Sequence, residues 1–331
     1  MFDVITIGSA SYDVFLKPHE ARIVKGKEYE AGEGVCFSLG AKIDVPELHF
    51  STGGSATNSA ITFSRQGFRS AALSKIGSDT SGEAILKCLK EQGVSEELVI
   101  LDKKYFTAYS VILTVKGQRT IFVHRGATEH LCCDEPIPYE KLKDAKWFYI
   151  TNLGGESEKI FVPLIEFAVS NNIKIALNPG KAQLKLGKKL APILSKIDVL
   201  ILNQEEASYL TGVAFADKEG IFKILDSWVK GVSIMTRGRT GFVACDNQYM
   251  YIGGILKEPK YVDRTGAGDA FGSACVAGIM KGMALGDAFQ LASANATSVL
   301  SKWGANEGLL SQDDDIYKFG KLEIIKKPCH E

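Results

Sequence analysis

The sequence lacks an excess of charge of either sign, since 39 basic residues balance 39 acidic ones. Proteins that bind nucleic acid or anionic membranes through their overall field are usually strongly basic. The sequence also lacks a long apolar run, and no stretch approaches the roughly 20 residues that a helix needs to span a bilayer. We therefore expect no nucleic-acid partner and no membrane partner, and any anion must be bound by a local site.

Targeting and cross-linking signals are missing as well. The opening residues MFDVITIGSA lack the basic start and long apolar core of a signal peptide, and they predict a β-strand instead. The seven cysteines are odd in number, scattered and without a CxxC pair, so neither a disulfide framework nor a zinc site is expected. These absences favour a cytoplasmic protein.

The familiar phosphate-binding motifs are also absent. No stretch matches GxxxxGK[ST], the HRD and DFG motifs of protein kinases, or a GxGxxG that opens the first helix. If this protein handles phosphate, it must hold the phosphate group with a different device.

The best candidate for that device is the heptad DRTGAGD at 263–269, which a run of small residues follows. Gly266, Ala267 and Gly268 leave the backbone free to approach a ligand, and the helix predicted after them would aim its first N–H groups at an anion. Asp269 adds a carboxylate that can accept the proton of an attacking hydroxyl. The heptad thus offers both parts of a phosphoryl-transfer site, although a tight strand-to-helix turn has the same composition.

The second half of the chain alternates predicted strands with predicted helices. The apolar runs that predict strands are WFYIT, IKIALN, DVLILN and VSIMT. Such alternation indicates right-handed βαβ units, and hence an α/β fold with a mostly parallel sheet that is covered on both faces. Asn178, Asn203 and Thr236 end three of these strands, at the edge where open α/β sheets bind ligands. We take them as candidate nucleotide contacts.

Two segments, 14–50 and 104–125, break this alternation. Both contain patterns typical of exposed strands, and we expect them to pair into a small β lid outside the main sheet. The whole chain, 1–331, then forms one α/β domain with a discontinuous lid. Arg125 leaves the second segment toward the ligand edge and is a candidate substrate contact, although an exposed arginine is the commoner outcome.

Candidate residues for binding an acceptor lie in the first sixty positions. Asp13 follows the first predicted strand at the ligand edge. Gly53 and Gly54 precede a predicted helix and allow a polyol to approach closely, while Asn58 can donate and accept hydrogen bonds at once, as a sugar hydroxyl requires. The structural alternatives are a loop cap at Asp13 and a helix N-cap at Ser55 or Thr57.

Candidate residues for binding a nucleotide and its metal lie beyond residue 200. Asn203 and Glu206 are one helical turn apart and can both face a hydrated Mg²⁺ or phosphate oxygens, but a capping box has the same spacing. Asn295, on a later predicted helix, is a candidate wall of an adenine pocket. The turn after the last predicted parallel strand has room for phosphates, and its candidate contacts are Thr236, Arg237, Gly238 and Gly241.

These motifs, in this order, resemble the PfkB or ribokinase-like family of carbohydrate and nucleoside kinases over almost the whole chain. Each motif alone is weak, but five in register are specific. The matching segments are Gly53 and Gly54 with Asn58, the stretch GSDTSG at 77–82, Asn203 with Glu206, the turn at 236–241 and the heptad at 263–269.

The resemblance implies a ribokinase-like three-layer sandwich with a small β lid. It implies transfer of the γ-phosphoryl group of ATP to a hydroxymethyl group, with Asp269 as the general base and the Gly266–Gly268 helix start as the anion hole. Asp13, Gly54 and Asn58 would hold the acceptor, which is a small sugar or nucleoside.

Cofactors and assembly are implied by the same resemblance. ATP and Mg²⁺ would be required, and a monovalent cation, K⁺, would sit near Asp263 and Thr265. Two copies of the chain would pair through their lid strands.

The identity of the acceptor stays open between a sugar and a nucleoside. The long 14–50 segment and the stretch TNLG at 151–154, which has no acidic residue in its middle, depart from a ribose kinase. A ligand-sensing homologue without turnover is a further alternative, against which the retained Asp269 argues. The apolar side chains that can cover a base, or serve only as lid core, are Phe37, Leu39, Phe106 and Tyr109.

Overall fold

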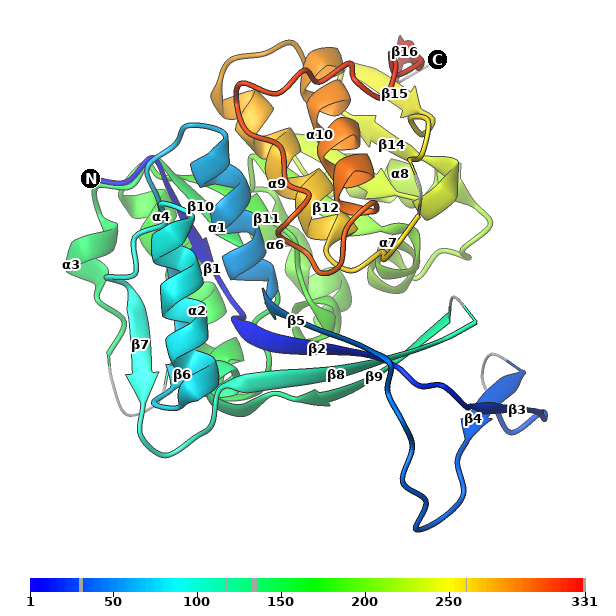
Figure 1. Cartoon of the computed structure of the whole chain (residues 1–331). Coiled ribbons are helices and arrows are strands. Elements are labelled where there is room, and N and C mark those ends of the chain that lie inside the picture. The colour runs from blue at the N-terminus through cyan, green and yellow to red at the C-terminus, as the bar shows by residue number, and fades with distance from the viewer. Residues whose placement is uncertain (30–31, 117, 133–135, 260, 330–331) are drawn as a thin grey trace.

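The protein is built on one ten-stranded sheet (Figure 1), seen in a computed structural model that describes residues 1–29, 32–116, 118–132, 136–259 and 261–329. The strand order is β16-β15-β14-β13-β12-β11-β10-β1-β6-β7. The strands from β13 to β7 run parallel to their neighbours, and β14, β15 and β16 add an antiparallel edge. The predicted α/β fold with a mostly parallel sheet is confirmed. The strand bounds are β1 (Val4–Ile7), β6 (Ser70–Gly77), β7 (Val99–Asp102), β10 (Trp147–Ile150), β11 (Lys174–Leu177), β12 (Val199–Asn203), β13 (Val232–Thr236), β14 (Phe242–Cys245), β15 (Tyr249–Gly253) and β16 (Ile324–Pro328).

Helices cover both faces of this sheet and give the three layers seen in Figure 1. The helices on the face toward the viewer are α1 (Ser55–Arg65), α2 (Thr80–Glu91), α9 (Ala267–Met280) and α10 (Leu285–Val299). The helices behind the sheet are α3 (Tyr139–Leu142), α4 (Phe161–Ser170), α5 (Lys181–Leu184), α6 (Ala191–Leu194), α7 (Gln204–Thr211) and α8 (Lys218–Trp228).

The central strands are buried on both sides, which explains their nearly continuous apolar sequences. In β10, Phe148 and Ile150 belong to the core beneath α4 and α7, while Trp147 and Tyr149 belong to the core beneath α9 and α10. Because side chains alternate along a strand, one short apolar run fills two separate layers.

A second, four-stranded sheet forms the lid, in the order β5-β2-β8-β9. Strand β2 runs antiparallel to β5 and parallel to β8, so the two segments that were expected to pair do so. A hairpin of β3 (Arg22–Lys25) and β4 (Glu33–Cys36) projects from this sheet as an arm (Figure 1). The lid strands are β2 (Ser11–Lys17), β5 (Glu47–Gly53), β8 (Ala108–Val115) and β9 (Gln118–His124).

Part of the strand prediction for the arm is wrong. The alternation between Cys36 and Phe50 predicted exposed strands, but residues 37–46 are irregular and β5 begins only at Glu47. Gly40, with a left-handed backbone, and Pro46 interrupt the run, because neither residue suits a continuous ladder.

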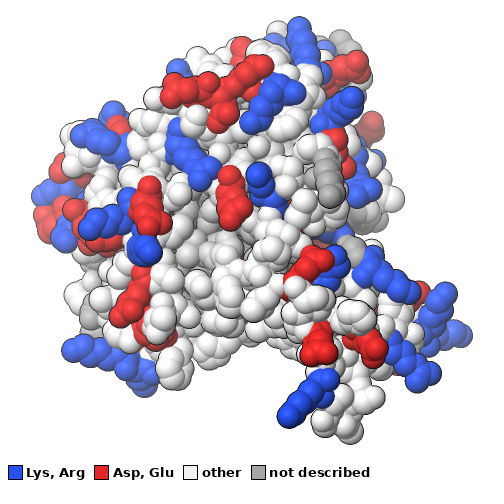
Figure 2. All heavy atoms as spheres, viewed as in Figure 1, with Lys and Arg blue, Asp and Glu red and all other residues white. Residues whose placement is uncertain are grey.

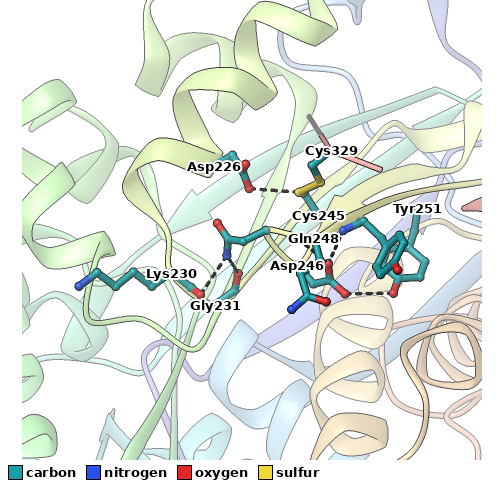
Figure 3. The surroundings of a disulfide bond; sticks show 10 residues. Asp226, Lys230, Gly231, Cys245, Asp246, Gln248, Tyr251 and Cys329 are labelled. Carbon is teal, nitrogen blue, oxygen red and sulfur yellow. Dashed lines mark hydrogen bonds between the residues drawn. A yellow bond between two sulfur atoms is a disulfide. The ribbon is translucent and has the colours of Figure 1, made fainter. Parts of the chain in front are cut away.

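The C-terminal strand is tied to the sheet by a disulfide that the cysteine pattern did not predict (Figure 3). Cys329, which follows β16, is bonded to Cys245 of β14, and Asp226 of α8 lies 3.1 Å from the Cys245 sulfur. These cysteines are 84 positions apart, and only the placement of β16 beside β15 brings them together. Spacing along the chain carried no signal of this contact.

Charged side chains of both signs are interspersed over the face of the molecule shown in Figure 2. This distribution agrees with the balanced composition. In the part of the chain that the structure describes, no helix has the length and hydrophobicity needed to cross a membrane.

The edge of the parallel sheet contains a buried ion pair between Lys75 of β6 and Asp102 of β7. The Lys75 Nζ and Asp102 Oδ2 atoms are 2.7 Å apart, and both side chains are almost fully buried. Burial acts to raise the pKa of Asp102, but hydrogen bonds from Lys75 and from backbone N–H groups outweigh it and lower the pKa to about 2.

We predict that Lys75→Met lowers the free energy of unfolding by about 3–5 kcal/mol, because it leaves the Asp102 carboxylate buried without its cation. The loss should be largest above the unfolded-state pKa and shrink as pH falls toward 2, since protonation removes the unpaired charge. Urea titrations at several pH values measure it. The control Lys87→Met removes an exposed pair with Glu91 and should cost under about 0.5 kcal/mol. Equal losses in both variants would contradict the interpretation.

Candidate active site

Two helix starts meet at Asp269, at the carboxyl edge of the sheet. Gly266 caps α9 in a left-handed conformation, and Asp269 lies in the first turn of that helix. Asn58, in the first turn of α1, donates from Nδ2 to Asp269 Oδ2 at 2.8 Å. Both helices direct the positive ends of their dipoles toward this carboxylate.

Burial raises the pKa of the Asp269 carboxyl group above its usual range, while hydrogen bonds from Asn58 and Ser55 act to lower it. A carboxylate with a raised pKa is a better proton acceptor than one in water, provided that it is still deprotonated at the working pH. The residue also keeps part of its surface exposed, so a ligand can approach it. Asp269 thus combines a raised pKa, fixed hydrogen-bond partners and an open side, which together suit the acceptance of a proton.

Glycine is required at Gly266 for a packing reason as well as for its backbone angle. A Cβ atom there would lie 2.3 Å from the Cβ atom of Ala305, so the loop after α10 packs directly on this turn. At Gly268 a Cβ atom would meet no other described segment of the chain within 4 Å, and the turn there is open to a ligand. The predicted anion hole is therefore closed on one side and accessible on the other.

Asp13 follows β1, as expected, but it lies within β2 of the lid sheet, so the alternative that it caps a loop is wrong. Its carboxylate accepts a hydrogen bond from Ser11 Oγ at 3.0 Å and fits against Gly53, where a Cβ atom would lie 2.1 Å from Asp13 Oδ2. Burial raises the pKa of Asp13, and the negative charges of Asp263 and Asp269 add to the rise. Asp13 therefore belongs to the same electrostatic site as the heptad.

Gly54 and Asn58 stand at the start of α1 beside Asp13. Gly54 caps the helix with φ of 97° and packs against the backbone of Ser9 and Ala10. No side-chain cap is present, which removes the N-cap alternative for Ser55 and Thr57 at this helix start. The sequence missed that Asn58 bonds the predicted base directly, because the two residues are 211 positions apart.

Asn203 and Glu206 form a capping box at the start of α7. Asn203 Oδ1 accepts from the Glu206 backbone N–H at 2.9 Å, and Glu206 Oε2 accepts from the Asn203 backbone N–H at 2.8 Å. The capping box that was stated as the structural alternative is thus present. Glu206 nevertheless lies near enough to Asp269 for the two charges to interact. Burial raises the pKa of Glu206, and the negative charges of Glu205 and Asp269 contribute to the rise.

A cavity of about 330 Å³ joins two of the predicted motifs, the turn at 236–241 and the heptad. Its size falls in the usual range for small-ligand sites. Polar backbone from two turns lies at one side of the cavity and suits a phosphate. An apolar wall from β14, residues 254–258, Tyr261 and α10 lies at the other side and suits a flat base. Its lining includes Thr236, Gly238, Arg239, Gly241, Phe242, Tyr261, Arg264, Ala267, Gly268, Phe271, Ser293, Ala296 and Thr297.

Four predicted contacts lie elsewhere or are already engaged. The Asn178 amide donates to the Ile201 carbonyl at 2.9 Å and joins two strands. Arg237 donates to the Thr240 carbonyl within its own turn, and Arg239 lines the cavity instead. Arg125 is exposed and pairs with Glu129 at 3.5 Å.

Asn295 is the fourth, and its predicted place in the pocket wall is wrong. The side chain is fully buried, donates to the Ala270 carbonyl at 2.9 Å and accepts from the Leu310 backbone N–H at 2.7 Å. It joins α9, α10 and the following loop. The cavity is lined from the other side of α10, by Ser293, Ala296 and Thr297. Which side of this helix faces the cavity could be learned only from the structure.

The side chains predicted to hold K⁺ contact an arginine of the lid that the sequence did not single out. Arg119 of β9 donates from Nη1 to Thr265 Oγ1 at 2.6 Å, and the same nitrogen lies 3.7 Å from Asp263 Oδ1. Thr265 in turn donates to Asp263 at 3.1 Å. Arg264 lines the cavity and also bonds Gln118 at 3.4 Å.

Known proteins are similar to this chain over most of its length. The family model described as "pfkB family carbohydrate kinase" matches residues 1–312. The cytidine kinase of Thermococcus kodakarensis is 25% identical over 92% of this chain and 98% of its own length, and the ribokinase of Haemophilus influenzae is 25% identical over 80% and 86%.

Solved structures share the fold at lower identity. The nucleoside kinase of Burkholderia thailandensis in complex with inosine has a TM-score of 0.75 at 20% identity, with coverage of 93% of this chain and 95% of that one. The Arabidopsis thaliana ribokinase complexed with ribose and ATP has a TM-score of 0.76 at 20% identity, with coverage of 96% and 98%.

We predict that Asn295→Ala destabilises the fold by about 2 kcal/mol or more, since a backbone carbonyl and a backbone N–H lose their buried partner. Urea denaturation measures the loss, and the dissociation constant of MgADP should change by less than about threefold because the residue does not line the cavity. The control Asn171→Ala removes one exposed bond at the end of α4. Unchanged stability together with weakened nucleotide binding would contradict this role and would support the predicted place of Asn295 in the pocket wall.

Proposed function

The chain belongs to the pfkB family of carbohydrate kinases, and on this premise we propose that it transfers the γ-phosphoryl group of ATP to a hydroxymethyl group of a sugar. The observation that carries the proposal is the partly buried Asp269 at the start of α9, bonded to Asn58 and adjoining the cavity that Ala267 and Gly268 line. A proton acceptor and an anion-binding helix start then meet at one point.

The chemistry assigned to this chain is positioning and proton transfer. Asp13 and Asn58 orient the acceptor so that its hydroxyl faces Asp269. Asp269 takes the proton as the hydroxyl oxygen bonds to the γ-phosphorus, while the bond from that phosphorus to the β-phosphate oxygen breaks and ADP leaves. The first N–H groups of α9 face the charge that develops on the transferred group. Such positioning and charge stabilisation supply most of the catalysis in phosphoryl transfer.

The residues around Glu206 fit a hydrated divalent cation. Burial raises the pKa of Glu206 most, and the negative charges of Glu205 and Asp269 add to the rise. A bound cation would offset this negative charge. Mg²⁺ commonly keeps its waters and binds one or two carboxylates together with substrate phosphates. When bound, Mg²⁺ would neutralise phosphate charge, and Asn203 and Glu206 would hold it through water or phosphate oxygens.

A nucleoside is the second candidate acceptor, and the lid supplies the observation that favours it. Val123 lies opposite Ser110, which bonds Asp13, so Val123 shares the cleft-facing side of the lid sheet with that carboxylate. Ile121, two residues before it, lies on the same side, and both side chains are about half exposed. An uncovered apolar surface above the acceptor site suits the face of a base.

The residues proposed from sequence to cover a base are less well placed. Tyr109 alternates with Ser110 and lies on the outer side of the lid sheet, while Phe37 and Leu39 belong to the arm. Phe106 is largely exposed before β8 begins.

Assembly and location are part of the proposal. The outer side of the lid sheet presents apolar side chains, which two copies of the chain would cover by pairing through their lids. These side chains include Tyr12, Leu48, Phe50, Tyr109 and Phe122. We further infer that the kinase acts in the cytoplasm, where ATP is available.

A phosphorylation screen over pentoses, hexoses and nucleosides, with ATP, Mg²⁺ and K⁺, tests the proposal. We expect one class of hydroxymethyl acceptor to yield a phosphate monoester and stoichiometric ADP. A sugar product supports the first candidate, and a nucleoside product replaces it with the second. Absence of phosphorylation of every acceptor, in a protein that binds MgATP, would contradict both.

We predict that Asp269→Asn lowers kcat by about 10² to 10⁴-fold, the usual scale for a lost general base. The dissociation constant of MgADP should change by less than about threefold, because the helix start and the cavity remain. Asp287→Asn, an exposed change in the first turn of α10, is the matched control and should keep full activity. Near-normal turnover of Asp269→Asn would remove the residue from its assigned role.

A further inference from the structure

The lid reaches the heptad through the tip of the β8–β9 hairpin. Arg119 contacts Thr265 and Asp263 at 2.6 and 3.7 Å, and Gln118 accepts a bond from Arg264. Arg119 and Gln118 belong to β9, which lies outside the five sequence motifs. They join the sheet that carries Asp13 to the loop that begins the anion hole.

Asp263 needs a counter-charge where it lies. Its side chain is 7% exposed, and its negative charge reaches far enough to raise the pKa of Asp13. Thr265 donates to Asp263 Oδ1, while Oδ2 is buried without a donor from any described residue. An uncompensated carboxylate beside a phosphate-binding helix start would repel the phosphates.

Arg119 supplies that charge. Within the described ranges it is the one basic side chain that forms an ion pair with Asp263, and its side chain is 29% exposed, so water screens the pair only partly. A guanidinium is always charged and presents several donors in a fixed plane, which suits simultaneous contact with a hydroxyl and a carboxylate.

The same contacts conflict with the K⁺ site that the family resemblance implies. Asp263 Oδ1 and Thr265 Oγ1 bond each other, and both face the Arg119 guanidinium. A second cation placed on these two oxygens would lie against the positive charge of the arginine. These two oxygens therefore do not fit a monovalent cation while Arg119 contacts them, and only Asp263 Oδ2 has no donor from a described residue.

We propose that Arg119 is a positioning residue that takes the place of a monovalent cation at Asp263 and couples the lid to the anion hole. The proposal rests on the proposed phosphoryl transfer. Because the arginine belongs to the lid, Asp263 is neutralised only while the hairpin lies on the 263–265 segment. The contact between Arg119 and Asp263 then links the position of the lid over the acceptor to the binding of phosphate.

The first arm of the test compares the wild-type protein in potassium chloride and in tetramethylammonium chloride, at a matched ionic strength of about 0.1 M. We expect the same kcat, the same MgADP dissociation constant and the same melting temperature in both salts. A wild-type protein that needs K⁺ for turnover, or that gains nucleotide affinity from it, would overturn the proposal.

The second arm removes the guanidinium. Arg119→Ala should weaken MgADP binding about tenfold in tetramethylammonium, as loss of a charge-assisted contact predicts, and K⁺ should restore part of the affinity by entering the vacated place. Arg119→Lys keeps the charge and should retain most of the affinity without K⁺. Arg22→Ala, an exposed arginine of the arm, is the matched control and should behave as wild type.

Calorimetric binding of MgADP and melting temperature keep this test separate from that of the proposed function, since neither needs an acceptor. If no acceptor is phosphorylated, the proposed function fails while these readouts still decide the role of Arg119. Nucleotide affinity of Arg119→Ala that equals wild type and is indifferent to K⁺ would overturn the proposal.

Discussion

The hydrogen bond from Asn58 to Asp269 is the contact on which the proposed site depends. It joins the first turns of α1 and α9, two helices that begin 212 residues apart and reach the same edge of the sheet. The parallel sheet places both helix starts at the carboxyl ends of its strands, as open α/β sheets do. One bond thereby fixes the orientation of the base and its distance from the acceptor side.

The site gathers several carboxylates, and this excess of negative charge accounts for its proposed ligands. Asp13, Glu206 and Asp269 all have pKa values raised first by burial, and Asp269 adds to the rise in the other two. Arg119 offsets Asp263 from the lid side. The proposed proton and divalent cation, and the guanidinium of Arg119, thus have separate places around the turn at 263–269.

Sequence reasoning reached the fold and most of the motifs because both depend on local patterns. Apolar runs ending in Asn203 and Thr236 predicted parallel strands, and the heptad predicted a helix start at 266, which the structure shows. The capping box at Asn203 and Glu206 was one of two alternatives stated for that spacing. Such features need only neighbouring residues and the periodicities of helix and strand.

What the sequence missed are contacts between distant segments. Arg119 lies in a strand whose pattern predicted only an exposed strand of the lid. Asn295 faces the core because of its position around the axis of α10. Cys329 meets Cys245 because β16 adds an edge strand to the sheet. None of these partners is marked by spacing along the chain. The packing of β9 on the 263–265 segment, the packing of α10 and the register of the edge strands decide them.

The central claim is that Asn58 holds Asp269 as a general base and lowers its pKa. The most direct test is the pH dependence of kcat/KM for wild type and Asn58→Ala. Activity requires deprotonated Asp269, so it falls as pH drops through the pKa of that group. Loss of the Asn58 hydrogen bond should raise that pKa, move the acidic limb to higher pH and lower kcat by about tenfold or more. An acidic limb at the same pH in both proteins would contradict the account.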